Sequence, residues 1–282
     1  DARQKTRLRA EVSSRDLLAG EEGGSGVIFG VRGRYKGLAL AAHGSGGSVL
    51  ALHDDSVPYP LTIDAILGHT RIKAEGSVTS LIRLSAIDMH LALRGDSLAQ
   101  LFPLLGIALP ETHAYAVAGR IVHSGQMWRF EKFSGTTGHS DFAGSLQIDH
   151  GAERPFVHGE LVSRLLDMDD LGPLIGARAP VAATDEKQTA AELAPAARVG
   201  AHVLPDLAFR TARWNSIDAD VSLRATTIRR AAGLPLDDLL AHFKLKDSVL
   251  SVDPLDFGLA GGHLKGGISL DGRHDPIEAR AR

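Results

Sequence analysis

Thirteen histidines are the first side chains to consider as metal ligands or proton carriers. His69 and His139 stand at equivalent positions of an internal repeat, but a third copy carries Gly261 at that position and has His263 out of step. Metal sites usually draw on ligands at a fixed spacing, such as His-x-x-x-His on a helix, and no such pair falls in an expected helix. We therefore expect no metal site and assign the histidines to turns and surfaces.

The sequence also lacks the patterns of a serine hydrolase and of a nucleotide-binding loop. A hydrolase nucleophile needs Gly-x-Ser-x-Gly at a turn from strand to helix. The nearest approaches, Gly44-Ser45-Gly46-Gly47-Ser48 and Gly138-His139-Ser140-Asp141, lack that spacing and lie among expected strands. Residues 30–37 are rich in glycine but lack the Lys-Ser/Thr ending of a phosphate-binding loop and open no helix.

Asp167, Asp169 and Asp170 form an acidic cluster without the glycine and the terminal glutamate of a calcium loop. Capping of a short helix by Asp167, with the other two in its first turn, accounts for all three. We therefore expect no catalytic residue, no cofactor and no enzyme activity.

The elements that carry these residues repeat along the chain. Residues 68–110 and 138–180 are two copies of one pattern, offset by 70 positions. Gly68-His69-Thr70 returns as Gly138-His139-Ser140, and residues 101–106, with Leu-x-Pro-Leu-Leu-Gly, return as 171–176. Residues 264–271 echo the strand part at 142–149. Such repetition is typical of folds that stack like units and present long surfaces.

Strands dominate the expected secondary structure. Residues 87–94 and 217–225 alternate apolar and polar side chains, which is typical of half-buried antiparallel strands. Short helices are expected at 97–105, capped by Asp96 and ended by Gly106, and at 168–175, capped by Asp167 and ended by Gly176. Residues 235–240 predict a third short helix or a turn.

Three parts are expected along the chain. Residues 1–176 form a repeat-bearing β part, 177–200 a flexible linker or exposed excursion, and 201–282 a further β part that can continue the same sheet. The middle segment lacks strand periodicity and is rich in Ala, Pro and charged residues.

Charge and composition exclude several classes of protein. The net charge of −3, with both signs interspersed, argues against a nucleic-acid partner. The absence of cysteine excludes disulfides, thiolate metal sites and thiol nucleophiles. No apolar run reaches the roughly 18 residues of a membrane span. The chain begins at Asp1 without a signal peptide, so we expect a processed or excised piece whose anchor lies elsewhere.

Many strands have an aliphatic face, whereas few helices are expected to cover one. Such a face must fold on itself, pair with another sheet or face lipid. The low aromatic content of 5%, with abundant aliphatic residues, suits a groove for acyl chains. The residues expected to line it are Ile87, Met89, Leu91, Leu93, Phe142, Leu146, Ile148, Val221, Leu223, Leu264 and Ile268.

Five blocks of the sequence carry a resemblance to a known family. They are Gly95-Asp96-Ser97-Leu98-Ala99-Gln100-Leu101-Phe102-Pro103-Leu104-Leu105-Gly106, residues 140–146, residues 166–176, residues 232–239 and residues 253–262. In this order and spacing they resemble the periplasmic region of the AsmA family of bacterial envelope proteins, related to TamB-like lipid transporters. The resemblance covers about residues 31–271.

The resemblance implies an elongated, curved antiparallel β-sheet with a hydrophobic groove and a few short helices. It also implies a location in the periplasm, with an anchor in the bacterial inner membrane outside this chain. Relatives are implicated in moving phospholipids between membranes and in outer-membrane integrity, so phospholipid or another acyl-chain lipid is the expected partner. A scaffold module of envelope assembly without a lipid ligand is the first alternative, and a hydrolase of envelope polymers is the second.

Overall fold

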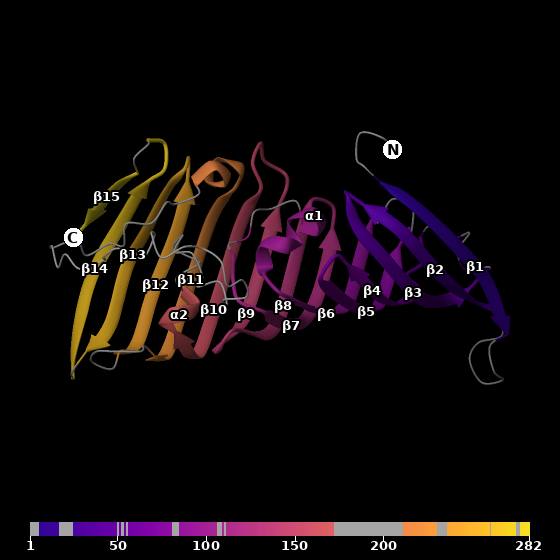
Figure 1. Cartoon of the computed structure of the whole chain (residues 1–282), viewed down its shortest axis with the longest axis horizontal. Coiled ribbons are helices and arrows are strands. Elements are labelled where there is room, and N and C mark those ends of the chain that lie inside the picture. The colour runs from indigo at the N-terminus through magenta and orange to yellow at the C-terminus, as the bar shows by residue number, and fades with distance from the viewer. Residues whose placement is uncertain are drawn as a thin grey trace, which may run out of the picture.

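The described part of the chain forms one long, open, curved sheet (Figure 1). The computed structural model describes residues 6–16, 25–49, 51, 54, 56–80, 85–105, 109, 111–171, 211–229, 236–259, 261–274 and 277–282. Within them fifteen strands pair in chain order, from β1 at one end to β15 at the other. This confirms the expected elongated β-sheet with few and short helices.

The elements have the following bounds: β1 (Arg7–Asp16), β2 (Ser25–Tyr35), β3 (Leu38–Ser48), β4 (Tyr59–Leu67), β5 (Thr70–Thr79), β6 (Ala86–Gly95), η3 (Leu98–Leu101), α1 (Phe102–Leu105), β7 (Tyr115–Ser124), β8 (Met127–Thr137), β9 (Ser140–Asp149), β10 (Phe156–Asp167), α2 (Met168–Leu171), η5 (Thr211–Ser216), β11 (Asp218–Arg229), β12 (Leu236–Lys246), β13 (Val249–Leu259), β14 (Gly262–Asp271) and β15 (Glu278–Ala281).

Alternation along each strand gives the sheet two different faces. Side chains opposite one another in neighbouring strands share a face, and the register therefore fixes whole rows. One row runs Ala42, Ala65, Ile72, Leu93, Val117 across β3 to β7. The row one residue along runs Ala41, Ile66, Arg71, Arg94, Ala116 on the other side. We call the side that carries Leu93 the apolar face and the side that carries Arg94 the polar face.

The sequence repeat is a repeat of strands. β5 and β9 lie 70 positions apart, and each follows a glycine with positive φ, at Gly68 and Gly138. A second offset links β8 and β9 to β13 and β14, which lie 122 positions later. Both pairs are bulged at the equivalent place, between Phe130 and Phe133 and between Val252 and Leu255.

The short helices partly follow the sequence prediction. Ser97 caps η3, because its Oγ accepts from the amides of Ala99 and Thr112, so the expected cap at Asp96 is wrong by one residue. Asp167 caps α2 as expected, with Oδ1 accepting from the Asp169 amide at 3.0 Å. The expected helix ends at Gly106 and Gly176 lie outside the described residues.

Residues 236–240 correct the prediction of a helix or turn, because they open strand β12. Asp238 has φ 48°, and the register with β13 shifts between Asp237 and Leu240. This bulge breaks the two-residue alternation, which is why the segment did not read as a strand.

One pair of neighbours departs from the antiparallel order. β10 and β11 run parallel, with Phe156 opposite Asp218 and Asp167 opposite Arg229. The strands after residue 217 therefore continue the same sheet as those before residue 168. The segment expected as a linker, 177–200, lies outside the described residues.

The core lies on the apolar face, towards the middle of the sheet. Leu93, Leu101, Tyr115, Val117 and Phe133 form a buried cluster. Leu98 and Leu105, from η3 and α1, pack against it together with side chains of β9 and β10. The two short helical segments thus cover the apolar face over part of the sheet.

Candidate functional site

All eleven residues expected to line a groove lie on the apolar face. In β6, Met89 is opposite Gly76 and Ile121, in the same face as Leu93. The chain of pairs continues through Leu146, opposite Phe130 and Gly159, to Leu223, opposite Leu161 and Ala241. It ends in β14, where Ile268 is opposite Val252. One continuous apolar surface therefore crosses strands far apart in the sequence.

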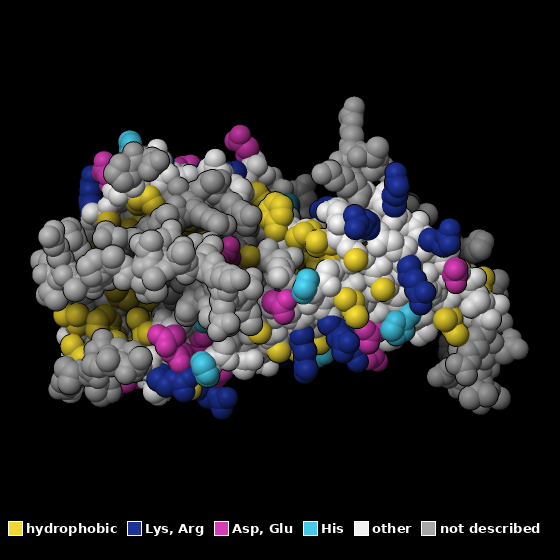
Figure 2. All heavy atoms as spheres, in the orientation of Figure 1, with side chains coloured by type: hydrophobic (Ala, Val, Ile, Leu, Met, Phe, Trp, Pro, Cys, Tyr) yellow, Lys and Arg dark blue, Asp and Glu magenta, His cyan; other side chains and the backbone are white. Residues whose placement is uncertain are grey.

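The apolar face is covered to different degrees along the sheet. Met89 and Leu93 are buried, at 6% and 7% exposure, whereas Leu264 near the other end is 54% exposed. Leu8 and Val12, on the same face in β1, are exposed as well. In the space-filling view, hydrophobic side chains group at the end of the molecule that carries β12 to β14 (Figure 2). The face thus offers apolar contact area at both ends.

Aromatic rings concentrate in the middle of the apolar face. Phe130 stacks on Phe133 with ring centroids 4.9 Å apart, and Phe142 meets Phe133 edge-on. His123 stacks on Trp128 at 4.1 Å in the neighbouring row. The bulge at 131–132 brings Phe130 and Phe133 to the same face, which simple alternation would place on opposite sides.

Ion pairs populate the polar face. Arg120 binds Asp88 through two nitrogen–oxygen contacts, and this hydrogen bond lowers the pKa of the Asp88 carboxyl. His242 lies 2.7 Å from Asp220, whose pKa it lowers in the same way. Lys265 lies 3.0 Å from Asp256. These contacts are typical of a solvated sheet surface.

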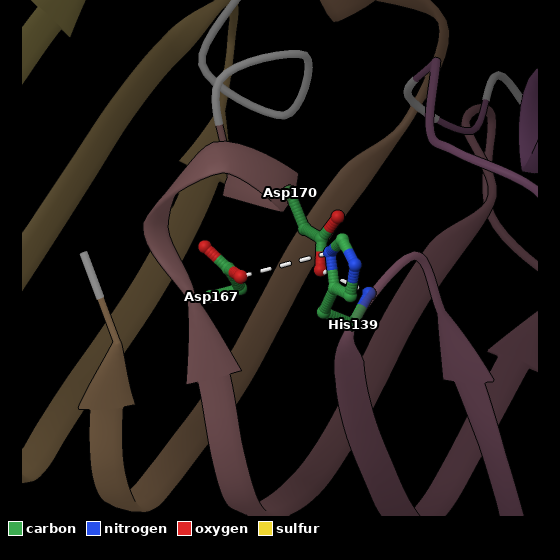
Figure 3. Close-up of side chains that lie close together, drawn as sticks. All are labelled: His139, Asp167 and Asp170. Carbon is green, nitrogen blue, oxygen red and sulfur yellow. Dashed lines mark hydrogen bonds and ion pairs between the residues drawn. The ribbon is translucent and has the colours of Figure 1, made fainter. Parts of the chain in front are cut away.

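A buried polar cluster joins the β8–β9 turn to α2 (Figure 3). Asp170 Oδ2 accepts hydrogen bonds from the His139 and Ser140 amides at 2.8 Å and from Ser140 Oγ at 2.7 Å. Its Oδ1 lies 2.8 Å from Nδ1 of His113. Asp167 Oδ2 accepts from the guanidinium of Arg229, on β11. The cluster joins the start of β9, the end of β10, α2 and the end of β11 in the middle of the sheet.

His139, Asp167 and Asp170 lie close enough to share a cation. The carboxylate oxygens of the two aspartates, however, already accept hydrogen bonds from backbone amides, a hydroxyl and a guanidinium. Hydrogen bonds of this kind satisfy buried carboxylates without a metal ion. Burial acts to raise the pKa of Asp167, but the hydrogen bond from Arg229 and that from the Asp169 amide outweigh it and lower the pKa. We assign the cluster a structural role.

An open pocket of about 420 Å³ lies over β10, β11 and β12. Its lining mixes charged, hydroxyl and aliphatic side chains from both faces around the bulge of β12: Val162, Ser163, Arg224, Ala225, Thr226, Asp238, Leu239 and Leu240. None of the residues expected to bind lipid lines it.

Comparison with known proteins identifies the family. The AsmA family pattern matches residues 24–282, which is most of the chain. The chain belongs to the AsmA family. It is 34% identical over 284 aligned positions to the AsmA family protein YhjG of Escherichia coli K12. That alignment covers 96% of this chain but 41% of the relative. No solved structure matches the chain.

In this AsmA-family chain, no described helix is both long and apolar enough to span a bilayer. Within the described residues, the structure brings the expected lining residues to one face, and none of them lines the pocket over β10 to β12. The contacts of Asp170 were not predicted from the sequence, which indicated only a favourable position in the first helical turn. The available signal was the repeat of Gly-His-Thr/Ser, followed in each copy by a short helix about 30 residues later.

Proposed function

We propose that this chain is the periplasmic, lipid-binding part of an envelope protein anchored in the bacterial inner membrane, and that it conducts phospholipids between membranes. Membership of the AsmA family supports an envelope-related function. The observation that carries the proposal is the apolar face, which the strand pairing continues from β1 to β14 across several bulges. Acyl chains would lie along this face, while head groups would stay at the polar edges.

The dimensions of the sheet favour a conduit over a single binding pocket. Neighbouring strands are about 4.8 Å apart, so fifteen strands extend roughly 65–70 Å along the sheet. That length exceeds the ~30 Å hydrocarbon core of a bilayer. Because the same aliphatic chemistry repeats from strand to strand, an acyl chain meets similar surface at each step. Each buried methylene contributes about 0.8 kcal/mol before ordering costs.

The test is the lipid content of the purified protein, measured by extraction and mass spectrometry. Leu223→Asp and Leu264→Asp place a charge on the apolar face in β11 and β14, and we expect both to lose most of the bound phospholipid. Leu264 is exposed, so its replacement spares the core. Ser145→Asp, on the polar face of β9, is the matched control and should retain the lipid. A wild-type protein without bound lipid would remove the proposal.

A scaffold module without a lipid ligand is the second candidate. The observation that favours it is the buried cluster under η3 and α1, where the apolar face packs against the protein itself. A scaffold predicts that Leu264→Asp leaves envelope function intact, whereas a lipid conduit predicts that this variant impairs it.

A further inference from the structure

Six exposed arginines lie together on the polar face at the β1 end of the sheet. They are Arg7, Arg9, Arg32, Arg34, Arg71 and Arg94. Strands β1 and β2 supply four of them, and β5 and β6 supply the other two. In Figure 2 the Lys and Arg side chains gather over this end of the molecule. We call these six residues the arginine patch.

The arginines of the patch face one another directly. Arg7 is opposite Arg34 and Arg9 is opposite Arg32 in the β1–β2 pair. Arg71 is opposite Arg94 in the β5–β6 pair. Like charges directly opposite each other across a sheet are destabilising. Three such pairs on one surface therefore lower the stability of the isolated chain.

Several cations elsewhere on the polar face have acidic partners. Arg120 contacts Asp88, Lys244 contacts Asp220 and Lys265 contacts Asp256. Among the described residues, no carboxylate forms an ion pair with any of the six arginines of the patch. The next row of the polar face carries the charged side chains Glu11, Asp64 and Lys73. Asp64 and Lys73 form an ion pair with each other, with the nitrogen and oxygen 3.4 Å apart. The patch is thus a local cationic surface on a chain whose net charge is −3.

The patch has an apolar centre. One row of the polar face runs Arg9, Arg32, Ala41, Ile66, Arg71, Arg94 across six strands. At about 4.8 Å per strand this row is roughly 24 Å long. Ile66 is 42% exposed between the two arginine pairs. Arginines that flank an exposed aliphatic side chain are suited to an interface with charged head groups above acyl chains.

We propose that the arginine patch binds the surface of an anionic phospholipid membrane and so holds the β1 end of the sheet against it. Guanidinium groups bind phosphate through paired hydrogen bonds, and the negative surface supplies the counter-charge that the protein lacks here. The apolar face that carries lipid in the proposed function lies on the opposite side of the same strands. The inference therefore adds an orientation and a second lipid contact that differ from the conduit.

Vesicle flotation tests this inference with the purified chain. Vesicles of phosphatidylcholine alone are compared with vesicles that also contain phosphatidylglycerol, at low and at raised salt. We expect binding to the anionic vesicles only, weakened by salt because screening shortens the reach of surface charges. Each basic residue near an anionic surface contributes about 1 kcal/mol, so the double variant R9Q/R32Q should lower vesicle partitioning roughly tenfold to thirtyfold. R71Q/R94Q should have an effect of the same size.

The control is R224Q/K246Q, which removes the same charge from exposed cations of the polar face on β11 and β12. It should bind vesicles like the wild type. Thermal unfolding of R9Q/R32Q should occur at the same or a higher temperature, because the variant removes an opposed pair of like charges. Equal binding of the chain to neutral and to anionic vesicles would overturn the proposal. So would an equal loss of vesicle binding in the patch variants and in the control variant. R9Q/R32Q should retain the phospholipid that co-purifies with the chain, because both arginines lie on the face opposite the lipid-lining residues, and this result separates the proposal from the lipid conduit.

Discussion

Single side chains decide how the two copies of the repeat differ. In the first copy, Ser97 caps η3, and exposed His69 lies 3.1 Å from Asp96. In the second copy, Asp167 caps α2, and Asp170 of the same helix accepts three hydrogen bonds from residues 139–140. A surface contact in one copy is thus replaced by a buried polar cluster in the other. The second copy ends next to β11, the strand that pairs in parallel with β10.

We expect Asp170→Ala to lower the free energy of unfolding by about 3 kcal/mol. The substitution leaves two backbone amides and the Ser140 hydroxyl without their acceptor, and an unsatisfied buried polar group costs about 1–3 kcal/mol. Denaturant unfolding of both proteins measures the difference. The control is Asp169→Ala, on the exposed side of the same helix, which should cost about 0.5 kcal/mol or less. Equal losses in the two variants would contradict the structural role of the cluster.

The sequence predicted one half of this cluster and not the other. Helix capping by Asp167 follows from residue type and from the apolar residues after it, which are local features. The contacts of Asp170 join residues about 30 positions apart through the meeting of a turn and a helix. No spacing rule within one element reports on such a meeting, so three nearby aspartates were explained by local helix effects alone.

At the scale of elements, strand periodicity and repeat spacing predicted most of the fold. The alternation at 87–94 and 217–225 became β6 and β11, and the 70-residue offset became the equivalence of β5 and β9. Two features of the fold were not predicted, because neither produces a regular alternation in the sequence. The bulge at Asp238 disrupts alternation in β12, and the parallel pairing of β10 with β11 depends on a non-local connection. Neither leaves a two-residue pattern in the sequence.

The turn before β9 provides a prediction about an element. Gly138 has φ 56°, and a Cβ there would lie 1.9 Å from Asp170 Oδ1. Its equivalent Gly68 has φ 59°, but a Cβ there would meet the Leu38 side chain at an ordinary 3.7 Å. Both substitutions by alanine carry the left-handed backbone cost of about 1–2 kcal/mol. Gly138→Ala adds the clash, so it should destabilise the protein more than Gly68→Ala.

The comparison is completed in the Asp170→Ala background. Without the carboxylate, Gly138→Ala should cost about as much as Gly68→Ala when both are measured by denaturant unfolding. An unchanged excess for Gly138→Ala in this background would mean that the turn itself, and not its contact with α2, is strained.

The whole molecule separates its chemistry between the two faces of one sheet. Aliphatic and aromatic side chains share one face from β1 to β14, while ion pairs and the arginine patch share the other. The segments η3 and α1 cover the apolar face in the middle, where Leu93 is buried, and Met89 is buried in a separate cluster with Ala74 and Val78. The ends remain more open, as the exposure of Val12 and Leu264 indicates. A lipid conduit requires the ends and the middle to act together.

Photo-cross-linking along the sheet tests that requirement. A photoreactive residue is placed at Val12, Leu91 or Leu264 on the apolar face, and at the neighbouring His90 or Lys265 on the polar face. We expect phospholipid adducts at all three apolar positions and few at their neighbours, because successive side chains of a strand point to opposite faces. Mass spectrometry of the purified adducts identifies the lipid. Adducts confined to one of the three strands would mean a local binding pocket, since a path between membranes requires contact with lipid at both ends and at the covered middle.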